Sequence, residues 1–171
     1  MKLIIMGAGG YGRVVAELAE QTGKYNQIFF LDDNSTDEKV IGKCDAYECY
    51  IAEDTEFYVA FGANAFRMNW LNTLMDKGAK IATIIHPTAY VSPTAKIGVG
   101  SAVLPKAIVN TNTVVNKGVI VNCGAAIDHD CIIGEGVHVC LNAVVKAENN
   151  IPELLKIEAC TVIENRQFPI K

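Results

Sequence analysis

An aliphatic side chain recurs at every sixth position through the second half of this chain, in which only 50% of all residues are hydrophobic. A period of six matches neither the turn of an α-helix nor the alternation of a strand, so it indicates a short strand-and-turn unit that stacks on copies of itself. The pattern therefore predicts a parallel β-helix of hexapeptide repeats. The thirteen positions are Val91, Ile97, Val103, Val109, Val115, Val121, Ile127, Ile133, Val139, Val145, Ile151, Ile157 and Ile163.

Two weaker periodicities accompany the first. Small or modest side chains follow each aliphatic residue by four positions and should point inward, as do Ala95, Ser101, Ala107, Thr113, Val119, Ala125, Cys131, Val137 and Ala143. Turn formers often come directly after the aliphatic residue, at Gly98, Asn110, Asn116, Asn122, Asp128 and Gly134. We expect these turn formers to adopt the unusual backbone angles of corners. Three units make one triangular coil, whereas strands of a sandwich would show longer alternation and irregular spacing.

The first part of the chain has a different pattern. An apolar stretch at 2–6 leads into a glycine-rich turn at 7–12, then a helical pattern at 13–21 and a second apolar stretch at 27–31. Asp32 and Asp33 follow, about twenty residues past the turn, as in the dinucleotide-binding fingerprint. Glycines let the backbone approach a pyrophosphate, and the helix N-terminus offers free N–H groups. A glycine turn that serves packing alone remains the alternative.

A full cofactor domain does not fit before the repeats. Only two further strand candidates, 57–61 and 80–84, are present, so we expect a half-sized α/β unit that holds one nucleotide. Gly62 and Asn64 lie in a second strand-to-helix turn, which should neighbour the first at the carboxyl ends of parallel strands. Arg67 then either faces a phosphate or is a solvated surface residue. The polar stretch 34–53 should wrap the sheet edge, and the predicted domains are 1–85 and 86–171.

Composition excludes several classes. The formal net charge is −4 and no basic cluster occurs, which argues against a nucleic-acid partner. No stretch approaches the roughly 20 apolar residues of a membrane span, and the apolar start is too short for a signal peptide. We therefore expect a cytoplasmic protein. Its six cysteines show no CxxC spacing and should be reduced thiols.

Polar residues that interrupt the coil pattern are the candidates for chemistry: Asn122, Asp128, His129, Asp130 and His138. Acyl transfer from a thioester needs a base, and histidine titrates near neutrality. A neighbouring carboxylate can orient the ring and stabilise its charged form. A solvated corner histidine is the alternative.

The spacing of the two histidines bears on assembly. Residues stack in such a coil when they are 18 apart, whereas His129 and His138 are 9 apart. A site that uses both would form between neighbouring subunits, and a triangular prism packs readily about a threefold axis. The sequence therefore predicts a homotrimer with interfacial active sites. Metal binding is not expected, because no third ligand recurs at a matching place.

Several motifs together resemble a known family. The chain contains Gly-Ala-Gly-Gly-Tyr-Gly, Leu-Asp-Asp-Asn, Ala-Phe-Gly-Ala-Asn and Ile-Asp-His-Asp-Cys-Ile-Ile-Gly, in this order. This order resembles the bacterial sugar acetyltransferases of the bacillosamine and perosamine pathways, a group that includes sialic acid O-acetyltransferase-like proteins. The resemblance implies an N-terminal Rossmann-like nucleotide-binding domain followed by a left-handed parallel β-helix, assembled as a trimer. It also implies N-acetylation of a UDP-4-amino-sugar by acetyl-CoA.

The resemblance assigns roles to individual residues. His129 matches the general base, and Asp130 matches the carboxylate that raises its basicity. His138 matches a residue at the acetyl-CoA site, where Ala147 replaces a glycine of the family. The positions that match the UDP-sugar site are Gly9, Gly10, Tyr11, Asp32, Asp33 and Gly62, to which the two turns add Gly7 and Asn64.

The likeness is weaker beyond 145. The stretch 146–156 lacks the expected corner glycines and contains Pro152, and members of the family usually continue for several more coils. Three other functions remain open: O-acetylation of a sugar such as a sialic acid, a nucleotide-sugar-binding trimer without catalysis, and, last, an NAD-dependent activity.

Overall fold

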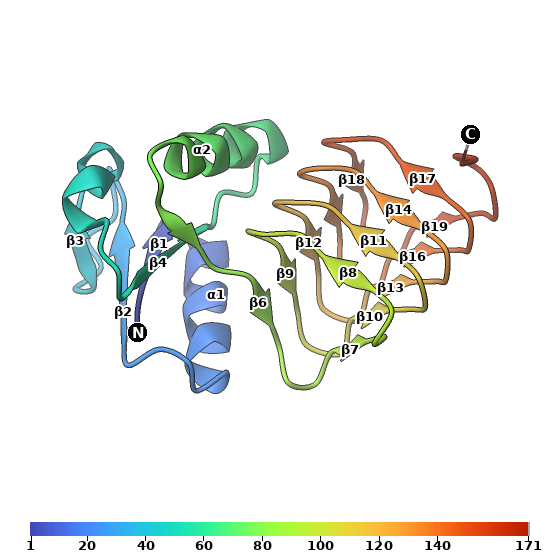
Figure 1. Cartoon of the computed structure of the whole chain (residues 1–171), viewed down its shortest axis with the longest axis horizontal. Helices are drawn as coiled ribbons and strands as arrows, with labels where there is room; N and C mark the ends of the chain where they lie inside the picture. Colours follow the sequence, from blue (N-terminus) through green and yellow to red (C-terminus); the bar gives the residue numbers. More distant parts are fainter. Residues whose placement is uncertain (171) are drawn as a thin grey trace. The chain divides into compact units, whose positions relative to one another are not determined.

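The computed structural model describes residues 1–170, and it divides the chain into two compact units, Met1–Ala82 and Thr83 onward. The expected boundary lies three residues later, at 85. The difference arises because Ile84–Ile85 already form a strand that pairs with the coil. The elements are coloured along the chain in Figure 1.

The first unit contains β1 Lys2–Met6, α1 Gly10–Gln21, β2 Gln27–Leu31, β3 Val40–Gly42, the 3₁₀ helix η1 Cys44–Tyr50, β4 Thr55–Val59, α2 Asn64–Asp76 and β5 Lys80–Ile81. Two-residue strands make up the second unit: β6 Ile84–Ile85, β7 Tyr90–Val91, β8 Lys96–Ile97, β9 Ala102–Val103, β10 Ile108–Val109, β11 Val114–Val115, β12 Ile120–Val121, β13 Ala126–Ile127, β14 Ile132–Ile133, β15 His138–Val139, β16 Val144–Val145, β17 Asn150–Ile151, β18 Lys156–Ile157 and β19 Val162–Ile163.

The first unit is a parallel sheet with the strand order β3-β2-β1-β4-β5. Its central strand β1 is apolar and almost fully buried, as a parallel strand covered on both faces should be. One core contains side chains from η1 and α2 together with Ile4, Met6 and Phe57. This arrangement confirms the Rossmann-like expectation and brings the turns after β1, β2 and β4 to one edge of the sheet.

The polar stretch 34–53 is more structured than expected. It supplies the edge strand β3 and the helix η1, and two of its side chains, Cys44 and Tyr47, are buried. Tyr47 packs edge-on against Trp70 of α2, with ring centroids 5.9 Å apart. The sequence pattern missed these elements because β3 spans only three residues and η1 buries only two side chains.

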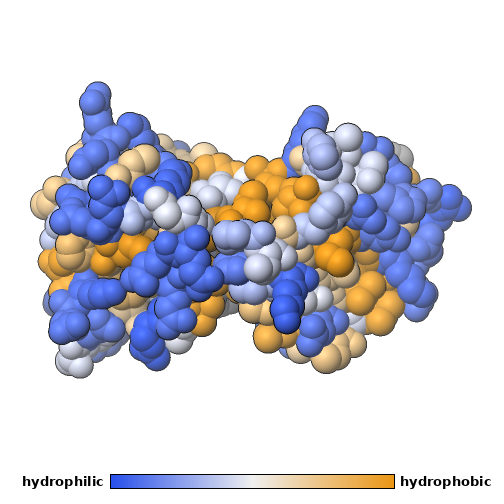
Figure 2. Space-filling model, turned by 90° about the horizontal axis from the view of Figure 1, so that it is seen from below, coloured by the Kyte–Doolittle hydropathy of each residue, from blue (hydrophilic) through white to orange (hydrophobic). Residues whose placement is uncertain are grey.

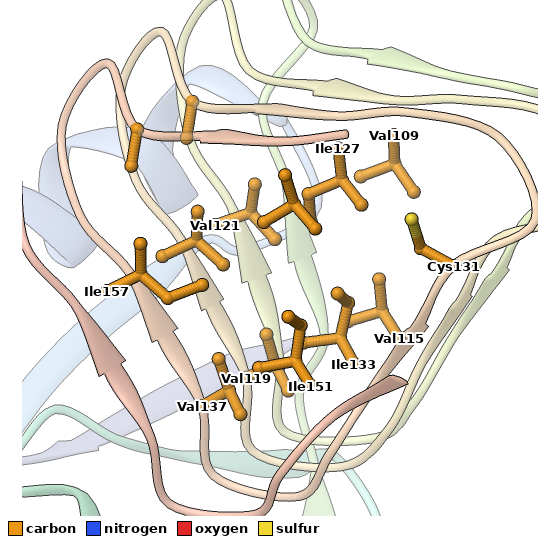
Figure 3. Packing of buried hydrophobic residues seen from close by; sticks show 14 of the residues in the cluster. Val109, Val115, Val119, Val121, Ile127, Cys131, Ile133, Val137, Ile151 and Ile157 are labelled. Atoms are coloured by element: carbon orange, nitrogen blue, oxygen red, sulfur yellow. The ribbon is translucent and has the colours of Figure 1, made fainter. Parts of the chain in front are cut away.

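The second unit is a triangular coil with three parallel sheets: β7-β10-β13-β16-β19, β8-β11-β14-β17 and β6-β9-β12-β15-β18. Each strand pairs with the strand 18 residues away, as Ala126 does with Val144. The fold is the predicted left-handed β-helix. The aliphatic positions form its core, together with Ala107, Val119, Cys131 and Val137 from the second periodicity. Figure 3 shows these side chains pointing into the coil from its sides.

The corners correct one expectation. Left-handed backbone occurs three residues after the aliphatic position, not one, and it recurs every six residues from Gly100 to Arg166. The glycines directly after the aliphatic residues instead allow the backbone of the next coil to lie close to them. A Cβ on Gly98 would lie 2.5 Å from the carbonyl carbon of Asn116, and one on Gly134 would lie 2.6 Å from the nitrogen of Glu153.

The coil continues in register through 146–163 despite the missing glycines. Its left-handed positions there are Glu148, Leu154, Cys160 and Arg166, with φ between 54° and 59°. Glu, Leu, Cys and Arg rarely adopt such angles, so this end of the coil contains local backbone strain. Pro152 fits a corner, where its carbonyl oxygen accepts the N–H of Leu155.

Candidate active site

The first glycine turn combines packing glycines with open ones. Gly7 has φ +99°, and a Cβ on it would lie 2.9 Å from the ring of Phe61. A Cβ on Gly12 would lie 2.0 Å from the carbonyl oxygen of Gly7, so this position requires glycine. By contrast, no described atom within 4 Å faces a Cβ built on Gly9 or Gly10. Gly9 and Gly10 therefore present open backbone, as a turn that approaches a ligand must.

The helix after this turn begins without a side-chain cap. Gly9 is the N-cap of α1, no side chain caps it, and the first turn contains no acidic residue. The first N–H groups of a helix have no partners within the helix, and they lie at the positive end of its dipole. This arrangement suits an anion such as a diphosphate.

Asp32 links the glycine turn after β1 to the turn that follows β2. Its Oδ2 accepts the N–H of Ala8 at 2.8 Å, and its Oδ1 accepts the N–H groups of Asn34 at 2.9 Å and Ser35 at 2.7 Å. Burial works to raise the pKa of Asp32, but these three hydrogen bonds together hold it below its ordinary value. Asp33 is tied to the backbone N–H of Cys44 at 2.9 Å. Both carboxylates thus shape the binding edge.

The second turn is fixed by a buried arginine. The Nη1 of Arg67 donates to the carbonyl oxygen of Phe61 at 3.1 Å, and its Nη2 donates to Oδ1 of Asn64 at 3.0 Å. Arg67 is only 1% exposed, so the alternative of a solvated arginine is wrong. No described atom lies within 4 Å of a Cβ built on Gly62.

Tyr11 is placed by the sheet beneath it. Its hydroxyl lies 2.7 Å from that of Tyr58, and the two rings pack edge-on. Tyr58 is fully buried on β4, which raises its pKa to about 12. This buried phenol therefore stays neutral and anchors Tyr11 beside the glycine turn.

The second unit carries the histidine corner, which comprises residues Asp128–Cys131 after β13. His129 Nδ1 lies 2.7 Å from Asp130 Oδ2. Both side chains are about half exposed, at 48% and 46%. Because an ionised carboxylate can only accept, Nδ1 of the neutral ring holds its proton toward Asp130 and Nε2 is the basic nitrogen. The pair has the geometry of a base with its orienting acid.

The charges around His129 tune it in one direction. The hydrogen bond to Asp130 raises the pKa of His129, loss of hydration opposes the rise, and the negative charges of Asp128, Asp130 and Glu148 add to it. The same bond to His129, followed by one from Asn112, lowers the pKa of Asp130. Asp128 contacts the backbone of His129 rather than its ring: Oδ1 of Asp128 accepts the backbone N–H of His129 at 2.8 Å.

The structure separates the candidate residues into two clusters within one chain. Asn122 lies at the corner after β12, and its Nδ2 contacts His138 Nε2 at 3.0 Å. His138 belongs to β15, in a different sheet from β13, which ends just before His129. Ala147 lies one coil beyond His129, 18 residues later, and is almost buried. Asn122 therefore groups with His138 rather than with His129.

Sequence reasoning missed several residues that shape these sites. Tyr58 is a buried support whose contact with Tyr11 depends on the folded sheet. Asn110, Asn112 and Thr113 lie one coil before the histidine corner and contact it. The 18-residue stacking rule was sufficient to find Asn110 and Asn112, because their partners are Asp128 and Asp130.

Two further findings concern residues 1–170. Within this range, no cluster of three or more His, Cys, Asp or Glu side chains is arranged to hold a metal ion. Neither helix in the same range has the length and apolar character needed to cross a membrane.

A left-handed coil of hexapeptide repeats with a histidine–aspartate pair on an exposed corner, together with a Rossmann-like unit, defines a class: the left-handed β-helix acyltransferases. Comparisons with known proteins narrow this class. The PglD N-terminal domain family matches residues 2–74. The acetyltransferase domain of PglB from Neisseria gonorrhoeae is 38% identical, with a TM-score of 0.93 over 96% of this chain and 83% of that one. The chain belongs to the bacterial sugar N-acetyltransferases of the bacillosamine and perosamine type.

Two other relatives bear on ligands. A structure of the same Neisseria gonorrhoeae domain in complex with acetyl coenzyme A is matched at 34% identity with a TM-score of 0.85, over 96% of this chain and 91% of that one. The GDP-perosamine N-acetyltransferase of Escherichia coli O157:H7 is 28% identical over 142 residues, which are 78% of this chain. The chain spans 64% of the length of this curated relative.

Proposed function

We propose that this protein transfers the acetyl group of acetyl-CoA to the amine of a nucleotide-linked 4-amino-sugar, with His129 as the general base. The contact of 2.7 Å between His129 Nδ1 and Asp130 Oδ2 on an exposed corner supports this function more than any other single observation. It leaves Nε2 as the nitrogen that takes a proton. Acyl transfer to an amine requires such a group.

In the proposed reaction the neutral sugar amine attacks the thioester carbonyl carbon directly. The C–N bond forms, and Nε2 of His129 accepts the proton that the amine loses. The tetrahedral intermediate then collapses, the C–S bond breaks, and the proton on His129 neutralises the departing CoA thiolate. Asp130 stabilises the imidazolium throughout, and no covalent enzyme intermediate is formed.

The first unit would bind the nucleotide. Open backbone at Gly9, Gly10 and Gly62 and the uncapped start of α1 support a diphosphate site at this edge. UDP is the nucleotide that the resemblance implies, and GDP is the alternative, because the Escherichia coli relative is named for GDP-perosamine. N-acetylation is favoured over O-acetylation, since that relative is an N-acetyltransferase.

The donor would bind along the coil near His138 and Ala147. Because His138 lies on β15, in a different sheet from β13, which precedes His129, we propose a homotrimer in which neighbouring copies complete each site. An outward column on the sheet that contains β13 supports such packing: Tyr90, Ile108 and Val162 are 54%, 41% and 46% exposed. Figure 2 shows that apolar surface, in orange, reaches the exterior of the molecule.

A nucleotide-sugar-binding trimer without catalysis is the second candidate. The strained coils after 145 favour it, since they adjoin the position of Ala147. The match over 91% of the domain solved with acetyl coenzyme A supports the enzyme instead.

Mass spectrometry tests the proposal directly. The protein is incubated with acetyl-CoA and a panel of UDP- and GDP-linked 4-amino-sugars, beside His129→Ala and a control at an exposed corner of another column, Asn142→Gly. We expect an acetylated sugar with wild type and the control, and a rate lower by about 10²–10⁴-fold with His129→Ala. Tight binding of a nucleotide sugar without any product would favour the non-catalytic candidate.

A further inference from the structure

The coil that precedes the histidine corner contacts both of its carboxylates. Asn112 Nδ2 donates to Asp130 Oδ1 at 3.0 Å, while the other oxygen, Oδ2, lies 2.7 Å from His129 Nδ1. Asn110 Nδ2 donates to Asp128 Oδ1 at 3.3 Å in the same way. The two oxygens of Asp130 therefore have different partners, one from each of two consecutive coils.

Asn112 is itself held in place. Its φ is 57°, close to the 55° of Asp130, so the two residues repeat one corner conformation 18 residues apart. The backbone N–H of Asn112 donates to Thr94 Oγ1 at 2.9 Å, one further coil back. From inside the coil, Thr113 Oγ1 donates to the carbonyl oxygen of Asp128 at 2.6 Å. The amide of Asn112 thus reaches Asp130 from a fixed backbone.

We propose that Asn112 is a positioning residue that holds the carboxylate of Asp130 toward Nδ1 of His129, so that Nε2 remains the basic nitrogen. The catalytic role of this contact rests on the proposed function. The orientation of the ring can be tested without it. A carboxylate free to rotate on an exposed corner spends part of its time away from the imidazole. A second hydrogen bond to Oδ1 restricts that rotation without adding charge.

The charged groups around His129 define what each substitution changes. Asp128, Asp130 and Glu148 supply negative charge, and Arg166 is paired with Glu148. Asn112→Gly removes the amide, keeps every charge and tolerates the positive φ. Asn112→Asp also tolerates this φ but places a carboxylate against Asp130. Asn142→Gly is the matched control, because Asn142 has φ 53° at a corner of a different column.

The first measurement needs no substrate. Ring ¹⁵N spectra of the full chain, titrated with pH, report the tautomer and the pKa of His129. In wild type we expect Nδ1–H and a pKa above the ordinary value. With Asn112→Gly we expect a mixture of tautomers and a lower pKa, whereas the added charge of Asn112→Asp should raise the pKa. Mixed tautomers and a lower pKa in Asn112→Gly, in which no charge changes, would not follow from a purely structural role, and Asn112→Asp calibrates the effect of charge alone.

Kinetics supply the second readout. With Asn112→Gly we expect kcat to fall by about tenfold, as for partners that orient a metal-bound histidine. Both KM values should change little, because Asn112 is not placed in either binding site. Its pH profile should move to lower pH. Unchanged tautomer, pKa and kcat in Asn112→Gly, as in Asn142→Gly, would overturn the proposal. Shifted spectra together with a fully active His129→Ala would uphold the positioning and reject the base, so the two failures are distinguishable.

Discussion

Asp130 meets two demands with one side chain. It occupies a left-handed corner position with φ 55°, which aspartate adopts more readily than most residues, and it orients the ring of the adjacent His129. Adjacent residues rarely face each other in a regular strand, so the corner makes the contact possible. The left-handed turn thus positions the carboxylate of Asp130 beside the proposed base.

Replacing this carboxylate should move the pH dependence. In Asp130→Asn the negative charge is lost, so the raised pKa of His129 should fall toward its ordinary value of about 6.5. Activity needs the neutral ring, so wild-type kcat/KM should rise with pH through an inflection above that value. In the variant the inflection should lie at lower pH, and the plateau should drop by about 10²-fold because the tautomer is no longer fixed. The pH profile of kcat/KM checks both, and an unmoved inflection would contradict the assignment.

The strained corners predict a gain in stability. Cys160 is exposed and has φ 58° without the conformational freedom of glycine. Cys160→Gly should stabilise the fold by about 0.5–1 kcal/mol, the difference between the left-handed penalty and the entropy that glycine loses on folding. Cys160→Ala keeps the strain and is the control, with a change near zero. Urea denaturation measures both, and equal midpoints would argue against strain.

Buried polar side chains link successive coils. Thr113, Cys131 and Asn149 follow one another at 18-residue intervals inside the coil, and all are fully buried. Their side chains donate to the carbonyl oxygens of Asp128 at 2.6 Å, Lys146 at 3.3 Å and Glu164 at 2.8 Å, each 15 residues later. This column satisfies corner carbonyl groups that the strand ladders do not reach.

The first member of this column allows a clean test. Thr113→Val keeps the shape but leaves the carbonyl oxygen of Asp128 and the N–H of Cys131 without the hydroxyl that both contact. We expect a loss of about 1–3 kcal/mol in the free energy of unfolding. Thr111→Val, at an exposed site of the same turn, should change it by less than about 0.5 kcal/mol. Chemical denaturation compares the two variants, and equal losses would show that the buried hydroxyl adds no more to the free energy of unfolding than an exposed one.

The strands and the core of the coil could be predicted because the six-residue period fixes which side chains point inward. The left-handed corner position could not, because Asn and Gly occur at several corner positions with different roles. Arg67 was ambiguous for another reason: its burial depends on how α2 packs on the sheet. The pairing of Asn122 with His138 also escaped, since these residues are 16 apart rather than 18 and lie at a corner and on a strand.

Assembly decides whether the two clusters meet. His129 lies at the corner after β13 and His138 on β15 of a different sheet, so the proposed trimer would bring them together only between copies. The outward column of Tyr90, Ile108 and Val162 lies in the sheet that contains β13. A site shared between copies has a property that a site within one chain lacks: defects in different clusters can complement each other.

Mixed trimers provide the corresponding measurement. His129→Ala and His138→Ala should each be nearly inactive alone. Co-expressed with different tags and purified as mixed trimers, they should regain about a third of wild-type activity, since one of the three interfaces in each mixed trimer combines two intact clusters. Two copies of His129→Ala with different tags are the control for the purification. Activity no higher than that of the parents would place each site within one chain.

The 18-residue coil also sets a rule for length variation. A single inserted or deleted residue in any strand would turn every later core side chain toward solvent, because inward and outward positions alternate. An insertion of one full coil would instead preserve the inward and outward register of every later strand and lengthen the prism by about 4.8 Å. Viable insertions and deletions in this half of the chain should therefore fall at the corners or come in multiples of one coil. Those that lie beyond the histidine corner would leave the distance from that corner to the start of the coil unchanged.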